Sequence, residues 1–196
     1  MSEEFYREAL ERFQGLLEQA QECGLNEPTA MTLATVDARG RPAARTVLLK
    51  EVGPAGFVFY TNTLSRKGEH LGGNPSAALC FFWQPLMEQV LIEGLVEPVS
   101  EAEADAYWET RPRLSQIGAW ASLQSQPLQS RQTLEQRFSE FETRFEGMPV
   151  PRPPHWSGYR IAPDFIEFWS SRPGRLHERT RYTLGEQGWQ RTSVYP

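Results

Sequence analysis

An arginine and a histidine near the end of the chain have the types and the spacing to act on an anionic ligand. Arg175 and His177 follow the run Ile166-Glu167-Phe168-Trp169 after a short linker of Ser, Pro and Gly. Residues two apart in an extended segment project to the same face, which would set a guanidinium beside an imidazole. Such a pair can hold an anion and offers a group that titrates near neutrality. A basic surface strand explains these residues equally well.

A second segment, residues 61–67, combines hydroxyl groups with two cations where a strand ends and a helix is expected to begin. Free backbone N–H groups, the Thr61 and Ser65 hydroxyls, Arg66 and Lys67 would converge at that helix start. Helix N-termini favour anions, and charge-assisted bonds add to the backbone donors. The segment therefore has the chemistry of a phosphate site, although an ordinary capped surface helix is the commoner explanation.

Two further groups of residues suit an anion. Tyr107 and Arg111 are four apart on one helical face, and Ser115 is expected to cap the next helix. These side chains suit a second phosphate, while stacking of Tyr on Arg is the commoner reason for such spacing. Arg45 and Lys50 flank an apolar run that we expect to be a strand buried on both faces. Their charges need either carboxylate partners, the usual case, or an anionic ligand at the rim of the fold.

The elements that would position these residues follow an order of strands, then helices, then strands again. Apolar residues at helical spacing predict a helix within residues 1–27 that stops near Gly24. Ser100 and Glu103 form a capping box that predicts a helix ended by Pro112. An antiparallel β-barrel with peripheral helices, a mainly β fold in one domain, is the economical arrangement. We expect strands over 31–36, 44–52, 57–61, 77–83, 89–98, 159–161, 165–169, 179–184 and 189–193, the first three as a meander, and further helices over 115–122 and 130–145.

Composition narrows the class of protein. The chain has 196 residues, of which 39% are hydrophobic and 23% charged, and it contains no run long enough to span a bilayer. The net charge of -5 argues against nucleic acid as a partner. Cys23 and Cys80 lack zinc or redox spacing, and no secretory signal is recognisable at the start, so we expect a cytoplasmic protein. The sequence has three histidines and no metal-binding motif, and we expect no metal. Walker, Gly-x-Gly-x-x-Gly and nucleophile-elbow motifs are absent as well.

Taken in order, these motifs resemble the pyridoxine/pyridoxamine 5'-phosphate oxidase family. The resemblance runs from about Pro28 to the C-terminus and is specific in combination. It implies a flavin mononucleotide (FMN) split β-barrel as a single domain over residues 1–196. Within it lie an N-terminal helix (1–27), a helical insertion (100–147) and C-terminal dimerisation and active-site strands (156–196). The motifs that carry it are Arg45-Thr46-Val47-Leu48-Leu49-Lys50, Phe59-Tyr60-Thr61-Asn62, Ser65-Arg66-Lys67, Arg111-Pro112-Arg113, Ser115-Gln116-Ile117-Gly118-Ala119-Trp120, Gln124-Ser125 and Arg175-Leu176-His177-Glu178-Arg179.

The resemblance implies where the ligands bind. FMN would lie across the interface of a homodimer, and the vitamin phosphate would be held by Lys50, Tyr107, Arg111 and Ser115, with Arg175, Leu176 and His177 over the pyridine ring. Arg175 and His177 are the implied catalytic residues, Arg175 by polarising the substrate and His177 by binding it. The implied FMN contacts are Arg45, Thr46, Val47, Leu48, Leu49, Lys50, Tyr60, Thr61, Ser65, Arg66, Lys67, Gln89, Gln124, Ser125, Trp169 and Arg179.

The implied reaction is oxidation of pyridoxamine 5'-phosphate or pyridoxine 5'-phosphate to pyridoxal 5'-phosphate, part of vitamin B6 metabolism. Hydride would pass to FMN and then, with dioxygen, give hydrogen peroxide. Two alternatives stay open: a related flavin oxidase acting on another ring, as in phenazine biosynthesis, and a non-catalytic protein that binds FMN or pyridoxal phosphate. The chain departs from the family pattern at Ser170, where Gln is usual, at its C-terminus, and in lacking a recognisable basic N-terminal stretch. The resemblance implies that these departures bear on substrate binding and leave the flavin site intact.

Overall fold

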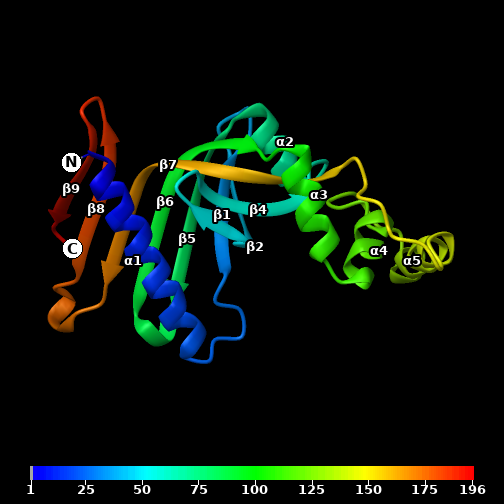
Figure 1. Ribbon diagram of the computed structural model, residues 1–196, viewed down its shortest axis with the longest axis horizontal. Coiled ribbons are helices and arrows are strands. Elements are labelled where there is room, and N and C mark those ends of the chain that lie inside the picture. The colour runs from blue at the N-terminus through cyan, green and yellow to red at the C-terminus, as the bar shows by residue number, and fades with distance from the viewer. Residues whose placement is uncertain (1) are drawn as a thin grey trace.

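The computed structural model describes residues 2–196, and one antiparallel sheet is its framework (Figure 1). Two of its strands, Ser76–Trp83 and Glu88–Pro98, lie inside the sheet, as their dense apolar content favours. Curled on itself and flanked by helices, the sheet is a split β-barrel, the predicted fold class. In spatial order its strands are β2 (Pro42–Leu48), β1 (Ala30–Val36), β5 (Ser76–Trp83), β6 (Glu88–Pro98), β7 (Trp156–Ser170), β4 (Gly56–Asn62) and β3 (Glu51–Gly53), with β8 (Glu178–Gly185) on β7 and β9 (Gly188–Val194) on β8.

The N-terminal helix α1 (Ser2–Glu22) fills the curl of the sheet. Its Phe13 is fully buried and meets the rings of Phe57 and Phe81 edge-on, with both pairs of centroids 5.0 Å apart. Glu8 ties the helix to the last two strands, accepting hydrogen bonds from Tyr182 and Arg191. Gly24 has a positive φ of 78° just after the helix, as its predicted role in ending the helix requires. No helix within residues 2–196 combines the length and apolar character needed to cross a bilayer.

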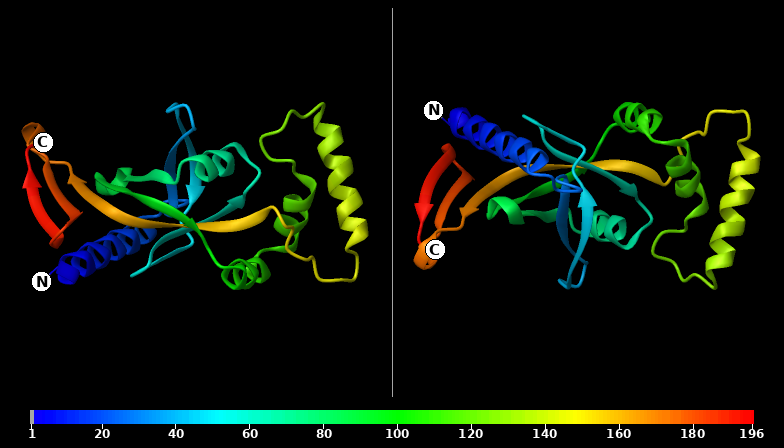
Figure 2. Two further views of the ribbon diagram at one scale, coloured as in Figure 1. Left: turned by 90° about the horizontal axis from the view of Figure 1, so that it is seen from above. Right: turned by 90° about the horizontal axis from the view of Figure 1, so that it is seen from below.

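The other helices are α2 (Arg66–Gly73), between β4 and β5, and a group of three at one end of the molecule. That group comprises α3 (Glu101–Thr110), α4 (Arg113–Ala121) and α5 (Arg131–Arg144). The Ser100–Glu103 capping box is formed in both directions, which confirms the predicted start of α3. A second apolar core joins these helices to the sheet. Figure 2 shows the three helices at one end of the molecule and the β8–β9 hairpin at the other. The second core consists of Trp108, Ile117, Phe145, Val150 and Trp156.

Two strand predictions are wrong around residues 44–52. The chain breaks at Leu49 and Lys50, whose N–H groups bond to Thr29 and Val58, so β2 and β3 are separate and lie at opposite edges of the sheet. The first strands are therefore two hairpins and not a meander. Residues 42–48 alternate between exposed and half-buried, which contradicts a strand buried on both faces. The apolar run 46–49 suggested burial within the chain. An edge strand can be this apolar without being buried by residues of its own chain.

The strands expected at 159–161 and 165–169 are one strand, β7, of 15 residues. A bulge at Asp164 lets it continue past Pro163, where proline is tolerated because the ladder is already interrupted. Gly94 on β6 faces this bulge, and a Cβ there would lie 2.1 Å from the Ala162 carbonyl oxygen. The long strand joins the helical end of the molecule to the β8–β9 end.

Candidate active site

A cavity of about 450 Å³ lies where β2 and β4 meet the ends of α2, α3 and α4. Most of its lining was predicted from the sequence as ligand-binding. Within the predicted run 45–50, Arg45 and Leu49 do not line this cavity: Arg45 bonds to Leu33 and Thr35 of β1, and the Leu49 side chain is packed in the core, 3% exposed. The cavity is lined by Thr46, Val47, Leu48, Lys50, Tyr60, Thr61, Lys67, Tyr107, Thr110, Arg111, Pro112, Ser115, Gln124 and Trp156.

One wall of the cavity is a stack of flat rings. Tyr60 lies parallel to Tyr107, with centroids 4.0 Å apart, and to Trp156, with centroids 5.3 Å apart. Gly158 makes room for Tyr60, because a Cβ on Gly158 would lie 2.7 Å from the ring. Burial, with a hydrogen bond to Glu51, raises the pKa of Tyr60, so its phenol stays protonated. Sequence reasoning missed Trp156 and Gly158, for which the Pro-rich connector before them gives no local signal.

Arg111 lies against this wall as an unsatisfied cation. Its guanidinium is 4.6 Å from the Trp156 ring centroid and 5.1 Å from that of Trp108. Its Nη1 is buried and has no hydrogen-bond partner among residues 2–196. Burial lowers the pKa of Arg111. A buried charged donor without a partner is costly, and an anionic ligand in the cavity would satisfy it.

Two expectations about this segment are wrong. Tyr107 stacks on Tyr60, and the cation–π partners of Arg111 are tryptophans, so the Tyr-on-Arg stack is not formed. Ser115 does not cap α4, because the helix begins at Arg113 with Pro112 in the capping position. Helix α4 can start before Ser115 because Pro112 is tolerated at a helix N-terminus, where no backbone N–H is needed for an intrahelical bond. Ser115 is instead in the first turn of α4, exposed to the cavity.

A second group of cations gathers at the start of α2. Lys67 Nζ donates to Thr61 Oγ1 at 2.9 Å, to Ser65 Oγ at 3.0 Å and to Gln124 Oε1 at 2.9 Å. Burial, with the nearby Arg45 guanidinium, lowers the pKa of Lys67 to about 8. Burial and Arg66 likewise lower the pKa of Arg45.

None of these three cations forms an ion pair with a carboxylate in the part of the chain that the structure describes. The start of α2, which carries Arg66 and Lys67, is packed closely on the preceding turn, because a Cβ on Gly68 would lie 2.0 Å from the Thr63 carbonyl oxygen. Three positive charges without carboxylate partners, beside the N-terminus of α2, would suit an anion.

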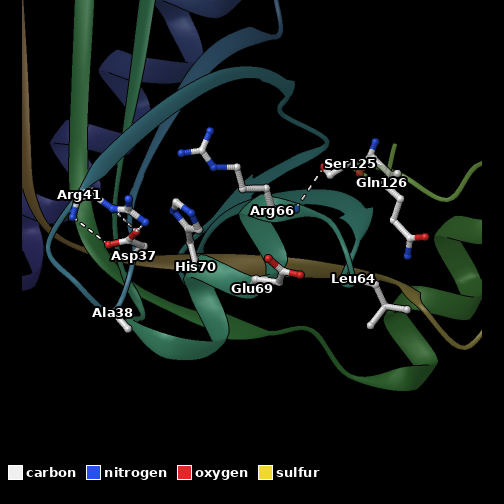
Figure 3. Close-up of a pocket in the computed structure, with 10 residues that line it drawn as sticks. Asp37, Ala38, Arg41, Leu64, Arg66, Glu69, His70, Ser125 and Gln126 are labelled. Carbon is white, nitrogen blue, oxygen red and sulfur yellow. Dashed lines mark hydrogen bonds and ion pairs between the residues drawn. The ribbon is translucent and has the colours of Figure 1, made fainter. Parts of the chain in front are cut away.

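Beside this group is a further hollow of about 490 Å³, whose lining includes Arg66, Gln124 and Ser125 (Figure 3). The backbone N–H of Arg66 donates to Ser125 Oγ at 3.2 Å. The loop after α4 therefore closes over the start of α2, as Gln124 also does through Lys67. The structure brings the predicted residues 60, 61, 65–67, 124 and 125 into one region.

The predicted residues Gln89, Trp169 and Arg179 form a row across three strands. Gln89 is opposite Trp169 in the β6–β7 ladder, and Trp169 is opposite Arg179 in the β7–β8 ladder. Glu167, which is 5% exposed, holds Arg179 through both carboxylate oxygens at 2.8–3.0 Å. Sequence reasoning missed Glu167, although a carboxylate inside the apolar run 165–169 signals a buried cationic partner.

Ser170 is on the opposite face of β7 from Trp169, and its hydroxyl donates to Glu88 Oε2 at 2.7 Å. Ser170 is 2% exposed, so its side chain is part of the interior. The serine that departs from the family pattern at this position is therefore buried and hydrogen-bonded within the sheet.

The prediction that Arg175 and His177 share one face of an extended strand is wrong. Pro173–Arg175 form a short 3-10 turn, in which Gly174 and Arg175 both have positive φ, of 68° and 62°. Pro173 fixes φ and Gly174 adopts the left-handed region freely, and the chain turns there before β8 begins. His177 packs on Trp169 with ring centroids 4.6 Å apart, and its Nδ1 accepts a hydrogen bond from the Arg172 N–H. Arg175 and Leu176 are exposed at this turn.

Within one chain the structure does not bring the two groups of predicted residues together. Trp156, in the cavity wall, and Trp169, beside His177, are at opposite ends of the 15-residue strand β7. At about 3.3 Å per residue the two ends are roughly 40 Å apart. Residues 2–196 contain no group of three or more His, Cys, Asp or Glu side chains placed to hold a metal ion.

Comparison with known proteins gives consistent matches over nearly the whole chain. Residues 16–145 match the family model described as pyridoxamine 5'-phosphate oxidase, and residues 156–196 match the one described as the pyridoxine 5'-phosphate oxidase C-terminal dimerisation region. A pyridoxine/pyridoxamine 5'-phosphate oxidase of Myxococcus xanthus is 55% identical, with 95% of this chain and 91% of that protein covered. One of the same name from Alkalilimnicola ehrlichii is 59% identical, with 93% and 94% covered.

Two solved structures have the same fold. PhzG from Burkholderia lata, crystallised with tetrahydrophenazine-1-carboxylic acid, superposes with a TM-score of 0.89 at 32% identity, covering 94% of this chain and 90% of that one. A pyridoxamine 5'-phosphate oxidase-related, FMN-binding protein from Nostoc punctiforme superposes with a TM-score of 0.75 at 19% identity, covering 94% and 97%.

Proposed function

The chain belongs to the pyridoxamine 5'-phosphate oxidase family, and from this premise we propose that it is an FMN-dependent oxidase of vitamin B6 phosphates. Its substrates are pyridoxamine 5'-phosphate and pyridoxine 5'-phosphate, and its product is pyridoxal 5'-phosphate. The amine substrate, with water and dioxygen, gives the aldehyde, ammonia and hydrogen peroxide. The alcohol, with dioxygen, gives the aldehyde and hydrogen peroxide.

The observation that carries this proposal is a pair of cationic sites without acidic partners on one cavity. Lys67 marks one site, together with Arg45 and Arg66, and the buried Nη1 of Arg111 marks the other. The reaction needs a cofactor phosphate and a substrate phosphate, each carrying close to two negative charges near neutrality. Flat rings, Tyr60 and Tyr107, line the same cavity, which suits an aromatic cofactor and a pyridine.

The residues at the start of α2 suit the phosphate of FMN. Arg45, Arg66, Lys67 and the hydroxyls of Ser65 and Ser125 would hold it, because they supply positive charge and several donors within one loop. The other predicted contacts in this region line the cavity and would bound the rest of the cofactor: Thr46, Val47, Leu48, Lys50, Tyr60, Thr61 and Gln124. When bound, FMN supplies two-electron oxidation with dioxygen as the final acceptor.

The chain's own residues bind and orient the substrate. Arg111, with Lys50, Tyr107 and Ser115, would hold the substrate phosphate, which anchors the ring at a fixed distance from that end of the cavity. Tyr60, whose ring is parallel to those of Tyr107 and Trp156, stays a protonated phenol and forms part of the cavity wall. His177, whose Nδ1 accepts from the Arg172 N–H, would present its other ring nitrogen to the substrate, and Arg175 would polarise it.

A homodimer completes this site. Arg175, His177, Trp169 and Arg179 are roughly 40 Å along β7 from the cavity of their own chain, too far to meet a substrate held by Arg111. The match of residues 156–196 to a dimerisation region supports a partner whose β8 end faces this cavity, with the flavin at the interface. The cytoplasmic location stays a prediction, with which the free thiols Cys23 and Cys80 are compatible.

Anaerobic titration of the purified, FMN-loaded protein tests the proposal. Addition of pyridoxamine 5'-phosphate should bleach the flavin absorption, and admission of air should restore it, with one peroxide and one pyridoxal 5'-phosphate formed per turnover. Pyridoxamine without phosphate is the matched control and should require a far higher concentration, because the Arg111 site is left unfilled. A yellow protein that pyridoxamine and pyridoxine phosphates do not bleach would contradict the proposed reaction.

A phenazine-type oxidase is the second candidate, supported by the structural similarity to PhzG at 32% identity. Reduced phenazine carboxylates carry one carboxylate in place of a phosphate, so they need fewer cationic and hydroxyl donors. Turnover of a reduced phenazine carboxylate, with no turnover of the vitamin phosphates, would favour this second function. The vitamin phosphates are preferred here because Arg111 lines the cavity together with Lys50, Tyr107 and Ser115, a set of donors that suits a dianion.

A further inference from the structure

Two buried polar side chains have no part in the function proposed above and were not singled out by sequence reasoning. Thr35 on β1 is 1% exposed, and His70 on α2 is 7% exposed. Thr35 Oγ1 lies 3.1 Å from His70 Nδ1, and Arg45 Nη1 donates to the same hydroxyl oxygen at 2.7 Å. A chain of hydrogen bonds thus runs from a buried histidine to one of the three cations at the start of α2.

The chemistry of the groups fixes the direction of the Arg45 bond. A guanidinium only donates, so Thr35 Oγ1 accepts from Arg45. The single hydroxyl proton of Thr35 is then available to Nδ1 of His70 in the tautomer that carries the imidazole proton on Nε2. Arg45 Nη1 also donates to the Leu33 carbonyl oxygen at 3.1 Å. Two oxygens of β1, the Leu33 carbonyl and the Thr35 hydroxyl, therefore bind the guanidinium. Of these two, the Thr35 hydroxyl also contacts α2, through His70.

This chain of bonds joins the three elements that build the anion site. Arg45 is on β2, Thr35 on β1, and His70 is on α2, one turn after Arg66 at the helix start. Figure 3 shows the imidazole of His70 and the guanidinium of Arg66 on the same side of that helix. Arg45 and Arg66 repel each other, so without a ligand the Arg45 side chain would be driven away from Arg66 unless something held it.

We propose that Thr35 and His70 are positioning residues that preorganise Arg45 for the FMN phosphate. His70 orients the Thr35 hydroxyl, and the hydroxyl oxygen holds the Arg45 guanidinium beside Arg66 and Lys67 before the ligand arrives. The inference rests on the proposed function in so far as FMN is the ligand of this site. Preorganisation of a long, flexible arginine lowers the ordering cost that phosphate binding would otherwise carry.

Matched substitutions test the role of each group by flavin affinity. Thr35→Val keeps the shape and removes the hydroxyl, while Thr35→Ser keeps the hydroxyl. His70→Leu removes the acceptor, while His70→Asn keeps an acceptor close to the position of Nδ1. Dissociation constants of FMN and of riboflavin, which has no phosphate, are measured on each apoprotein by quenching of flavin fluorescence. Thermal unfolding of each apoprotein is recorded alongside.

Thr35→Val and His70→Leu should weaken FMN binding by about tenfold, the effect of losing one hydrogen bond to a charged group, and change riboflavin binding less than twofold. Thr35→Ser and His70→Asn should restore most of the FMN affinity. In an Arg45→Ala background, Thr35→Val should have no further effect on FMN, because the residue it positions is gone. If Thr35→Val fails to fold, the pair His70→Leu and His70→Asn gives the same comparison.

Equal loss of FMN and riboflavin affinity, unchanged FMN affinity in Thr35→Val and His70→Leu, or an undiminished effect of Thr35→Val without Arg45 would each overturn the proposal. So would a wild-type chain that binds no FMN. A wild-type chain that binds FMN but oxidises no vitamin phosphate would refute the proposed function alone, and the selective loss of FMN affinity in the variants would still support positioning by Thr35 and His70.

Discussion

The lowered pKa of Lys67 makes a quantitative prediction about flavin binding. In the free protein, burial and Arg45 lower this pKa to about 8, so the ammonium is largely lost by pH 9. A phosphate dianion at hydrogen-bond distance stabilises the ammonium and raises the pKa in the complex well above that of the free protein. Above pH 8, binding of FMN must therefore take up one proton.

The coupling between proton uptake by Lys67 and FMN binding sets how the dissociation constant of FMN changes with pH. Below pH 8 Lys67 is charged in both states, and the affinity for FMN should be independent of this group. Between pH 7 and pH 9 the dissociation constant should rise by about tenfold, and above pH 9 the slope should approach tenfold per pH unit. Titration of the apoprotein with FMN, followed by fluorescence at constant ionic strength from pH 7 to 9.5, measures the curve.

Three controls isolate the group. Lys67→Met should bind FMN more weakly at pH 7 and show no slope, while Lys67→Arg carries a charge that does not titrate in this range and should also give a flat curve. Riboflavin should bind to the wild-type chain without the slope, because it offers no phosphate. A flat wild-type curve for FMN, or a slope that persists in Lys67→Met, would refute the reasoning.

Four other substitutions have expected outcomes. Arg111→Gln should raise the KM for pyridoxamine 5'-phosphate tenfold or more with the FMN content unchanged, since it removes a charge-assisted donor to the substrate phosphate. Steady-state peroxide assays measure the KM, and absorption spectra measure the FMN content. A loss of flavin in this variant would contradict the assignment. Arg175→Ala and His177→Ala should lower turnover while the protein stays yellow, and colourless protein would reassign these residues to flavin retention. Gly158→Ala should lower the free energy of unfolding by about 1–3 kcal/mol, because the new Cβ overlaps the Tyr60 ring; urea denaturation with an unchanged midpoint would contradict that overlap.

Local chemistry made parts of this fold predictable. The Ser100–Glu103 capping box fixes the start of α3 because both of its hydrogen bonds are formed within four residues. The positive φ of Gly24 at the end of α1 is equally local. The cation group at the start of α2 was also predictable, since Ser65, Arg66 and Lys67 are consecutive and a helix start orients them.

What could not be predicted depends on contacts between distant segments. Gln124 reaches Lys67 across 57 positions, and Trp156 meets Tyr60 only because β7 pairs with β4. The apolar run after Arg45 suggested a fully buried strand, whereas the sheet leaves that strand at an edge. The turn at Gly174 was overlooked because alternation of side chains was assumed through a Pro-Gly pair, where the backbone leaves the extended region.

The length of β7 has a genetic consequence. If each site combines the cavity of one chain with the β8 end of the other, lesions at the two ends behave differently in cis and in trans. A chain with Arg111→Gln mixed with a chain with Arg175→Ala regenerates one intact site in each mixed dimer, about a quarter of the wild-type sites after random assortment. A chain that carries both lesions damages both sites of any dimer it enters, including the one whose cavity is wild type. Alleles of this protein should therefore complement each other according to the end of β7 on which they fall.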